Sequence, residues 1–225
     1  MISLNKLKAI KKACKINDII FNEIIKNFNF KTEKDIEKFI LKRFMDFNVK
    51  KAYPPIVANN NSVIHAKLRN KRLEKGFLVM DFGCRYGGNA SDMTRTIFLG
   101  KANKKEKKLY ELILDCEEKC IKKLKIGIKC KGLDIYARKL LGKYKKYFTH
   151  GLGHGVGYRI HMRPRISFKS DNVTKENDVV AIEPGIYVKD KKNEFGIRVE
   201  DTVYVGKKNE ILTKSSKKFI EIDLF

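Results

Sequence analysis

The sequence predicts an α+β fold built from two similar halves. Two helical segments, an extended segment and a two-stranded ribbon precede residue 105, and two helical segments, a histidine-rich segment and a second ribbon follow it. No linker rich in proline, serine or glycine separates the halves. Because such linkers commonly mark domain boundaries, we expect one domain over residues 1–225, with halves of 1–105 and 106–225.

Two amphipathic helices are expected at the start of the chain. Apolar residues recur at three- and four-residue steps from Leu4 to Ile24, with lysines on the other faces, which predicts a helix over residues 4–26. Thr32 is suited to cap a second helix, whose apolar positions run from Ile36 to Phe47. Both helices are expected to cover a hydrophobic core.

An extended segment and a ribbon complete the first half. The two prolines of YPPIVANNNSVIH, residues 53–65, exclude a helix, and the asparagines that follow mark a turn. Residues 75–100 combine an apolar run, a glycine-rich turn and a second β-rich run, which predicts an antiparallel ribbon.

The second half repeats this order. The spacing of apolar residues predicts a third helix over 104–124 and a fourth over 133–141, after a turn at Gly132. Residues 177–205 then predict a second ribbon around the charged turn DKKNEFG.

Each ribbon carries one carboxylate on each of its strands. These are Asp81 and Asp92 in the first ribbon and Glu183 and Glu200 in the second. Antiparallel pairing brings opposed residues within about 5 Å. A solvated pair of acids is the simpler interpretation of one ribbon alone, but apolar neighbours surround the acids in VMDFG and AIEPG. Buried carboxylates need a neutralising partner, because unpaired burial costs several kcal/mol.

Three of the four histidines lie in FTHGLGHGVGYRIHMRP, residues 148–164. The glycines around His154 are expected to allow close approach of the backbone and unusual dihedral angles. A single histidine is commonly structural, but four carboxylates with a nearby histidine can supply donors for two divalent cations. A site with this many oxygen donors favours Mn²⁺, with Co²⁺ and Zn²⁺ as alternatives.

Composition bears on the binding partners and the cellular location of the protein. The net charge of +24 makes nucleic acid a secondary partner, although lysines scattered over the chain are also typical of an A/T-rich genome. No apolar run approaches the roughly 20 residues that span a membrane. The five cysteines form no CxxC pair, and Cys116 and Cys120 lie four residues apart on a predicted helix, so we expect reduced thiols, core packing of that pair and a cytoplasmic protein.

Four motifs together resemble one family. SDMTRT, HGLGHGVG, EPGIYV and GIRVEDTV are similar to the pita-bread metallopeptidases, specifically the Xaa-Pro aminopeptidase and prolidase branch. The resemblance extends from about Leu4 to Leu212. It implies a curved antiparallel sheet covered by helices, and hydrolysis of the N-terminal bond of peptides, preferably Xaa-Pro, by a hydroxide that bridges two metal ions.

The resemblance also assigns residues. It implies five metal ligands, with Asp92 and Glu200 bridging: Asp81, Asp92, His154, Glu183 and Glu200. Glu183 would also carry a proton from the water to the leaving nitrogen. The substrate side would be lined by His65, His150 and His161, of which His65 and His161 would hydrogen-bond the scissile carbonyl. Arg198 would pair with a buried carboxylate or with the substrate terminus.

Two departures from the family pattern leave alternatives open. Met162 follows His161 where the family often has an acid, and the additional N-terminal domain of many relatives is expected to be absent. The length is closer to methionine aminopeptidase, which is the enzymatic alternative. A pita-bread scaffold that binds protein or RNA without catalysis is the other alternative. We expect a monomer, with a homodimer as the second choice.

Overall fold

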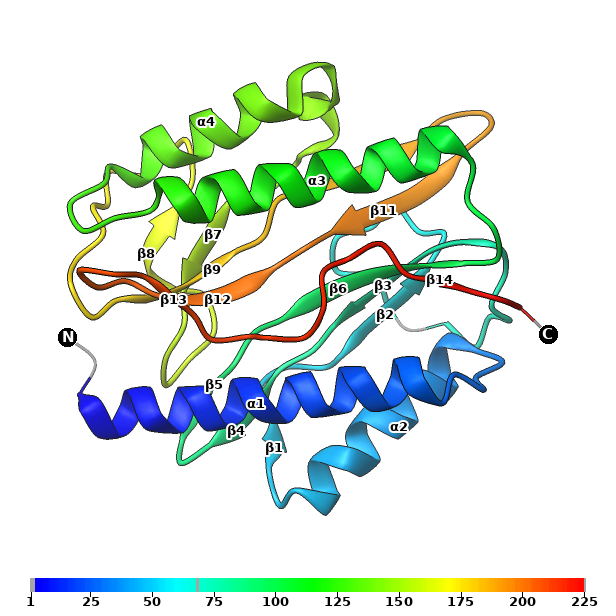
Figure 1. The fold of residues 1–225 in the computed structure, drawn as a ribbon, viewed down its shortest axis with the longest axis horizontal. Helices are drawn as coiled ribbons and strands as arrows, with labels where there is room; N and C mark the ends of the chain where they lie inside the picture. Colours follow the sequence, from blue (N-terminus) through cyan, green and yellow to red (C-terminus); the bar gives the residue numbers. More distant parts are fainter. Residues whose placement is uncertain (1–2, 68, 225) are drawn as a thin grey trace.

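Four α-helices within residues 3–67 and 69–224, the part of the chain that the structure describes, lie as two pairs on opposite sides of the strands in this computed structural model (Figure 1). One pair is α1 (Leu4–Lys26) and α2 (Glu33–Asp46), and the other is α3 (Lys104–Lys123) and α4 (Cys130–Leu141). The 3-10 helix η1 (Gly142–Tyr147) follows α4. Thr32 caps α2 as predicted, because its side chain accepts a hydrogen bond from the Asp35 backbone.

The strands of each half lie mainly in their own sheet. Three strands of the first half and the C-terminal β14 form a four-stranded sheet of order β14-β6-β3-β2: β2 (Ile56–Asn59), β3 (Gly76–Asp81), β6 (Thr94–Leu99) and β14 (Glu221–Ile222). The second half contributes a five-stranded sheet of order β13-β12-β9-β7-β8: β7 (Gly153–Gly155), β8 (Met162–Ile166), β9 (Val179–Ile182), β12 (Asp201–Tyr204) and β13 (Glu210–Ile211). The remaining strands are β1 (Lys50–Lys51), β4 (Cys84–Tyr86), β5 (Asn89–Ala90), β10 (Gly185–Lys189) and β11 (Glu194–Arg198).

Both predicted ribbons are confirmed. In the first, β3 pairs antiparallel with β6, and its turn region carries the short strands β4 and β5. The second is interrupted: β10 pairs with β11 near the turn and β9 pairs with β12 further away, with Pro184 and Val199 at the break. This break puts Glu183 and Glu200 between regular strand segments rather than inside them.

Two details differ from the sequence-based expectation. The turn before α4 is at Gly127, which has a φ of +80°, whereas Gly132 lies inside α4. Glycine favours that turn because positive φ costs it little. The sheet is also not wholly antiparallel, since β14 pairs in parallel with β6. The C-terminal segment returns to the first half, where Ile222 packs against the core beneath α1 and α2.

Two main apolar cores lie under the two helix pairs, and a smaller cluster joins α1 to β9. The core of the first half lies between α1, α2 and the β2, β3 and β6 strands, and that of the second lies between α3, α4 and the second ribbon. All five cysteines are free and buried, so the expected core packing of Cys116 and Cys120 is confirmed. Among the described residues, the helices are too short or too polar to cross a bilayer.

Candidate metal centre

The two acids of the first ribbon lie at one end of it. Asp81 is the last residue of β3 and pairs with Thr94, and Asp92 lies two residues before the start of β6. The Tyr53 hydroxyl contacts both carboxylates, at 2.6 Å from Asp81 Oδ1. Asp81 and Asp92 are only 9% and 4% exposed, so protein groups replace most of their hydration.

The acids of the second ribbon reach the same place from the other half. The Glu183 backbone N–H donates to the carbonyl of Leu152 at 2.8 Å, which ties the end of β9 to the histidine segment. The Glu200 backbone N–H donates to the Thr94 carbonyl at 3.1 Å, and the Thr94 hydroxyl donates to Glu200 Oε2 at 2.6 Å. Glu200 is therefore held by the first half of the chain.

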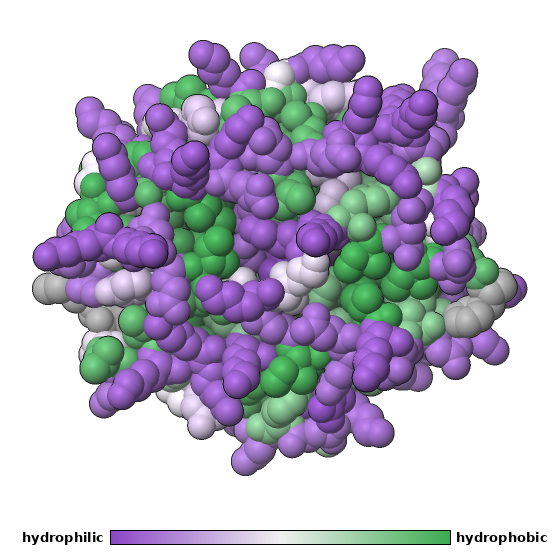
Figure 2. All heavy atoms as spheres, in the orientation of Figure 1, coloured by the Kyte–Doolittle hydropathy of each residue, from purple (hydrophilic) through white to green (hydrophobic). Residues whose placement is uncertain are grey.

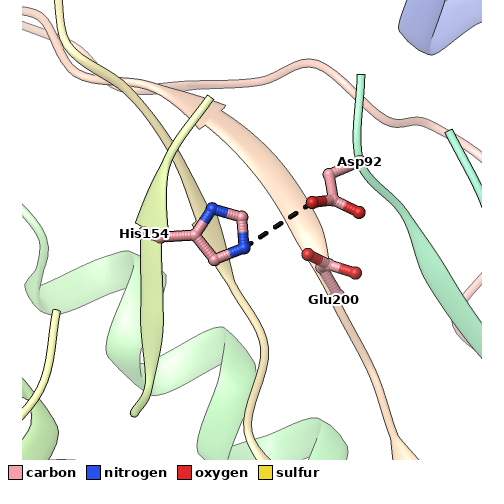
Figure 3. A group of neighbouring side chains, drawn as sticks. All are labelled: Asp92, His154 and Glu200. Atoms are coloured by element: carbon pink, nitrogen blue, oxygen red, sulfur yellow. Dashed lines mark ion pairs between the residues drawn. The ribbon is translucent and has the colours of Figure 1, made fainter. Parts of the chain in front are cut away.

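His154, in the middle of β7, faces these acids. Its Nδ1 lies 3.1 Å from the Gly155 carbonyl, which leaves Nε2 directed at the carboxylates. Nε2 is 3.6 Å from Asp92 Oδ2 and 3.5 Å from Glu183 Oε1. Figure 3 shows the imidazole of His154 opposite Asp92 and Glu200, which come from separate parts of the fold.

The glycines of HGLGHGVG serve close packing. A Cβ on Gly153 would lie 1.9 Å from the Ala181 carbonyl oxygen, and one on Gly155 would lie 2.2 Å from that of Arg163. The expected unusual dihedral angles are not found, because no glycine of this motif has a positive φ. Glycine is needed here because β7 lies against backbone on both sides.

The electrostatics of the cluster follow from burial. Burial raises the pKa values of Asp92, Glu183 and Glu200 well above their usual range, and neighbouring carboxylates raise them further. Burial also lowers the pKa of His154 to about 4, so its imidazole is neutral near pH 7. A neutral imidazole and clustered acids that repel one another are suited to a cation.

The donor spacing fits a metal ion. One ligand atom each from Asp92, His154 and Glu200 lies within 4.8 Å of the others. Metal–ligand bonds of about 2.0–2.2 Å place donor atoms roughly 3–4.4 Å apart around one ion, so this group is close to that requirement. Glu183 and Asp81 adjoin it through His154 and Tyr53, and the five predicted ligands are brought together.

Arg198 lies against the cluster, as predicted. Its guanidinium donates to Asp81 Oδ2, and its Nε donates to the Thr94 hydroxyl at 3.0 Å. A further contact joins Nη1 to the Tyr187 hydroxyl at 2.5 Å. Arg198 is 2% exposed, so the structure favours the expected pairing with a buried carboxylate.

A cavity of about 340 Å³ opens onto the cluster. All five predicted ligands line it, together with His65, His161 and Arg198. The remaining wall is mainly apolar and includes Pro54, Pro55, Ile56, Ile64 and Ile160. The His161 and His154 rings meet edge to face, with centroids 4.3 Å apart.

The position of His150 differs from the expectation that it lines the substrate side. It is not among the described residues that line the cavity. Its Nε2 is 3.1 Å from the Tyr187 hydroxyl, and its Nδ1 is 3.9 Å from Glu183 Oε2. His150 therefore contacts the cluster through Tyr187 and Glu183 rather than from the cavity.

Sequence reasoning missed three residues of this site: Tyr53, Thr94 and Tyr187. Thr94 lies in the SDMTRT motif and Tyr187 in EPGIYV, so their motifs pointed to the region without a role for either hydroxyl. Tyr53 precedes the proline pair, and its distance of 28 residues from Asp81 gives no signal of contact.

Buried acids around a neutral histidine at the wall of a cavity are a donor set suited to divalent cations. The model of metallopeptidase family M24 matches residues 8–207. The chain belongs to metallopeptidase family M24, and the resemblance seen in the four motifs is confirmed.

Similar proteins support the assignment of the chain to this family. The Xaa-Pro dipeptidase of Pyrococcus horikoshii is 36% identical over 97% of this chain and 64% of its own length. The solved prolidase of Thermococcus sibiricus has a TM-score of 0.92 at 32% identity, over 98% of this chain and 62% of its own. The X-Pro aminopeptidase of Thermotoga maritima has a TM-score of 0.91 at 31% identity, over 98% and 64%. These structures confirm the pita-bread fold, and the chain spans less than two thirds of each of these relatives.

Proposed function

We propose that the chain hydrolyses the N-terminal peptide bond of peptides, preferably an Xaa-Pro bond, with two divalent cations. Asp92, His154 and Glu200 hold donor atoms within 4.8 Å of one another, and Asp81 and Glu183 line the same cavity, which carries this proposal. Similar proteins named Xaa-Pro dipeptidase, prolidase and X-Pro aminopeptidase support the substrate class.

The proposed cations are Mn²⁺, with Co²⁺ and Zn²⁺ as alternatives, because four of the five donors are carboxylates. Asp81, Asp92, His154, Glu183 and Glu200 would hold the two ions. When bound, such ions would supply the Lewis acidity that activates water near neutral pH and polarises the scissile carbonyl.

Glu183 is proposed to move the proton. Its side chain is 16% exposed and lines the cavity, so it can reach both a nucleophilic water and the leaving nitrogen. It would accept the proton that the attacking water loses and deliver it to the nitrogen of the broken bond. In an Xaa-Pro bond that nitrogen belongs to the proline ring, and protonation lets it leave as an amine.

His65 and His161 are proposed to bind the substrate carbonyl. Both line the cavity, and His161 is adjacent to His154. An N–H from either ring would donate to the carbonyl oxygen and to the negative charge that develops there. The apolar wall near Ile64 and Ile160 would exclude water from the bond and contact an apolar side chain or the prolyl ring.

The test is hydrolysis by metal-stripped protein reconstituted with Mn²⁺, Co²⁺ or Zn²⁺. Xaa-Pro dipeptides, Xaa-Pro-Xaa tripeptides and Met-Ala-Ser are compared, and His161→Gln is measured beside the parent. We expect metal-dependent cleavage of the proline peptides and a lower kcat for the variant. Dipeptide against tripeptide preference separates prolidase from aminopeptidase activity. Cleavage of Met-Ala-Ser alone supports methionine aminopeptidase instead, and no turnover with any metal supports the non-catalytic scaffold.

We also propose that residues 1–225 form a single catalytic domain, that the protein is a monomer and that it is cytoplasmic. The packed halves support the first point, and five free, buried cysteines are typical of a reducing compartment. Light scattering of the metal-loaded protein tests whether it is a monomer, since a mass twice the chain mass of 26.1 kDa would indicate a homodimer.

A further inference from the structure

A groove with none of the residues of the metal-centre cavity lies at the opposite end of β3 from Asp81. Its volume is about 510 Å³, and it lies between the start of β3, the start of α3, η1 and the β10–β11 turn. A shallower depression of about 350 Å³ adjoins it along α3 and shares Lys105, Leu109 and Tyr144 with it. Figure 1 shows the β10–β11 turn next to the first turn of α3. We call the two together the α3 groove.

The α3 groove is lined by five exposed lysines: Lys75, Lys104, Lys105, Lys108 and Lys192. Within residues 3–67 and 69–224, none of them has a carboxylate within ion-pair distance, whereas Lys101 and Lys107 of the same region pair with Asp223 and Glu221. Figure 2 shows hydrophilic side chains projecting at the upper right, where the start of α3 lies in Figure 1. These lysines are therefore free to contact an anion.

The acids of the groove are already engaged. Glu106 accepts from the Asn103 backbone at 2.7 Å in the cap of α3. Asp190 accepts from the backbone N–H groups of Lys192 and Asn193 at 2.8 and 2.9 Å. Glu194 accepts from Ser62 at 3.1 Å. Five lysines face these three acids over the two depressions together, which leaves the α3 groove a formal charge of +2, with the excess along α3 at Lys104 and Lys108.

Aromatic rings accompany the lysines. Tyr144 and Tyr147, from η1, and Phe195, from β11, line the groove and are partly exposed. The η1 sequence GKYKKY also contains lysines between these two tyrosines, and Lys146 Nζ lies 4.9 Å from the centroid of the Tyr147 ring. Rings of this kind stack on the faces of unpaired bases, while lysines contact the phosphates between them.

We propose that the α3 groove binds single-stranded nucleic acid. Alternating phosphates and planar bases match the free lysines and partly exposed rings, and a duplex would keep its bases away from the rings. No residue of the groove lines the cavity of the metal centre. Binding is thus independent of the proposed peptide hydrolysis, and the two can succeed or fail separately.

The first test measures binding of a fluorescein-labelled oligouridylate of about ten nucleotides by anisotropy over a range of salt concentrations. The groove variant carries Lys75→Gln, Lys105→Gln and Lys192→Gln. The control carries Lys8→Gln, Lys12→Gln and Lys15→Gln on the exposed face of α1, which removes the same net charge. We expect the groove variant alone to lower the salt slope of log K by about 2, at about 0.7 for each lost phosphate contact. Equal losses in both variants would overturn the proposal, because the net charge alone would then explain binding.

The second test addresses the rings. Tyr144→Leu with Tyr147→Leu keeps apolar packing, and Tyr158→Leu is the control because Tyr158 is exposed on another surface. We expect the double variant to weaken binding about tenfold or more, with no effect of the control. Circular dichroism verifies folding of each variant. An unchanged Kd in the double variant, or equal affinity for a duplex of the same length, would contradict the proposed groove.

Discussion

Thr94 holds Glu200 through both backbone and side chain. The Thr94 carbonyl accepts from the Glu200 N–H at 3.1 Å, and its hydroxyl donates to Glu200 Oε2 at 2.6 Å. The same hydroxyl accepts from Arg198 Nε at 3.0 Å. One residue of the first half therefore orients a proposed metal ligand of the second half, at the point where the halves meet.

Thr94→Val should weaken metal binding without unfolding the protein. Valine keeps the shape of threonine but removes the hydroxyl, so Glu200 loses a donor and Arg198 loses an acceptor. Loss of such an orienting partner typically costs about 10–100-fold in metal affinity. Calorimetric titration of the metal-stripped variant with Mn²⁺ measures the change in affinity.

Thr174→Val is the matched control for this variant. Thr174 is also buried, but its hydroxyl donates to the Lys125 carbonyl near α4, away from the metal centre. It should lose stability by about 1 kcal/mol and keep its Mn²⁺ affinity. Equal Mn²⁺ affinity in the two variants would show that Thr94 does not orient Glu200.

Tyr53→Phe tests the hydroxyl that joins Asp81 and Asp92. Removing it leaves two buried carboxylates without that donor. We expect Mn²⁺ affinity to fall by about 10–100-fold, because the two acids are then free to take other orientations. Tyr110→Phe is the control, since its buried hydroxyl donates at 3.0 Å to the Lys217 carbonyl instead. Parallel calorimetric titrations of both variants decide the point, and an effect of equal size in the control would count against an orienting role.

The helices, the ribbons and the four acids that meet at the site were predictable because their signals are local. Periodic apolar residues mark α1 to α3, and apolar strand neighbours mark Asp81 and Glu183, whereas the ligand roles came from the resemblance of the four motifs. The contact of Tyr53 with two acids and the displacement of His150 from the cavity depend on the packing of distant segments, so no spacing indicates them. The turn at Gly127 was missed because Gly132 offered the same residue type five positions later, and only the backbone angle separates them.

Metal binding should release protons near neutral pH. The pKa values of Asp92, Glu183 and Glu200 are raised in the metal-free protein, so these acids retain protons above the pH at which free carboxylic acids lose them. A cation needs the carboxylate form, so binding displaces the protons and the affinity rises with pH. His154 contributes no proton at pH 7, because its pKa is lowered to about 4.

Calorimetric titrations with Mn²⁺ in buffers of different ionisation enthalpy measure this proton release. The observed binding enthalpy should change with the ionisation enthalpy of the buffer, with the sign expected when the buffer takes up protons that the protein releases. Asp92→Asn should release fewer protons and bind Mn²⁺ more weakly. Its metal-free form should unfold at a temperature equal to or above that of the parent, because one repelling, buried acid is removed. Buffer-independent enthalpies for the parent would contradict the raised pKa values.

Two glycine substitutions should have opposite effects on stability. Gly153→Ala would place a Cβ 1.9 Å from the Ala181 carbonyl oxygen, so β7 must move away from β9 and carry His154 with it. We expect a loss of about 1–3 kcal/mol or more in the free energy of unfolding, with loss of Mn²⁺ binding. Gly132→Ala, within α4, would place its Cβ in open space, with nothing within 4 Å, and should stabilise the protein by about 0.5–1 kcal/mol. Urea unfolding of both variants measures these changes, and a Gly153→Ala protein with parental stability and Mn²⁺ affinity would show that β7 does not need the close backbone approach to place His154.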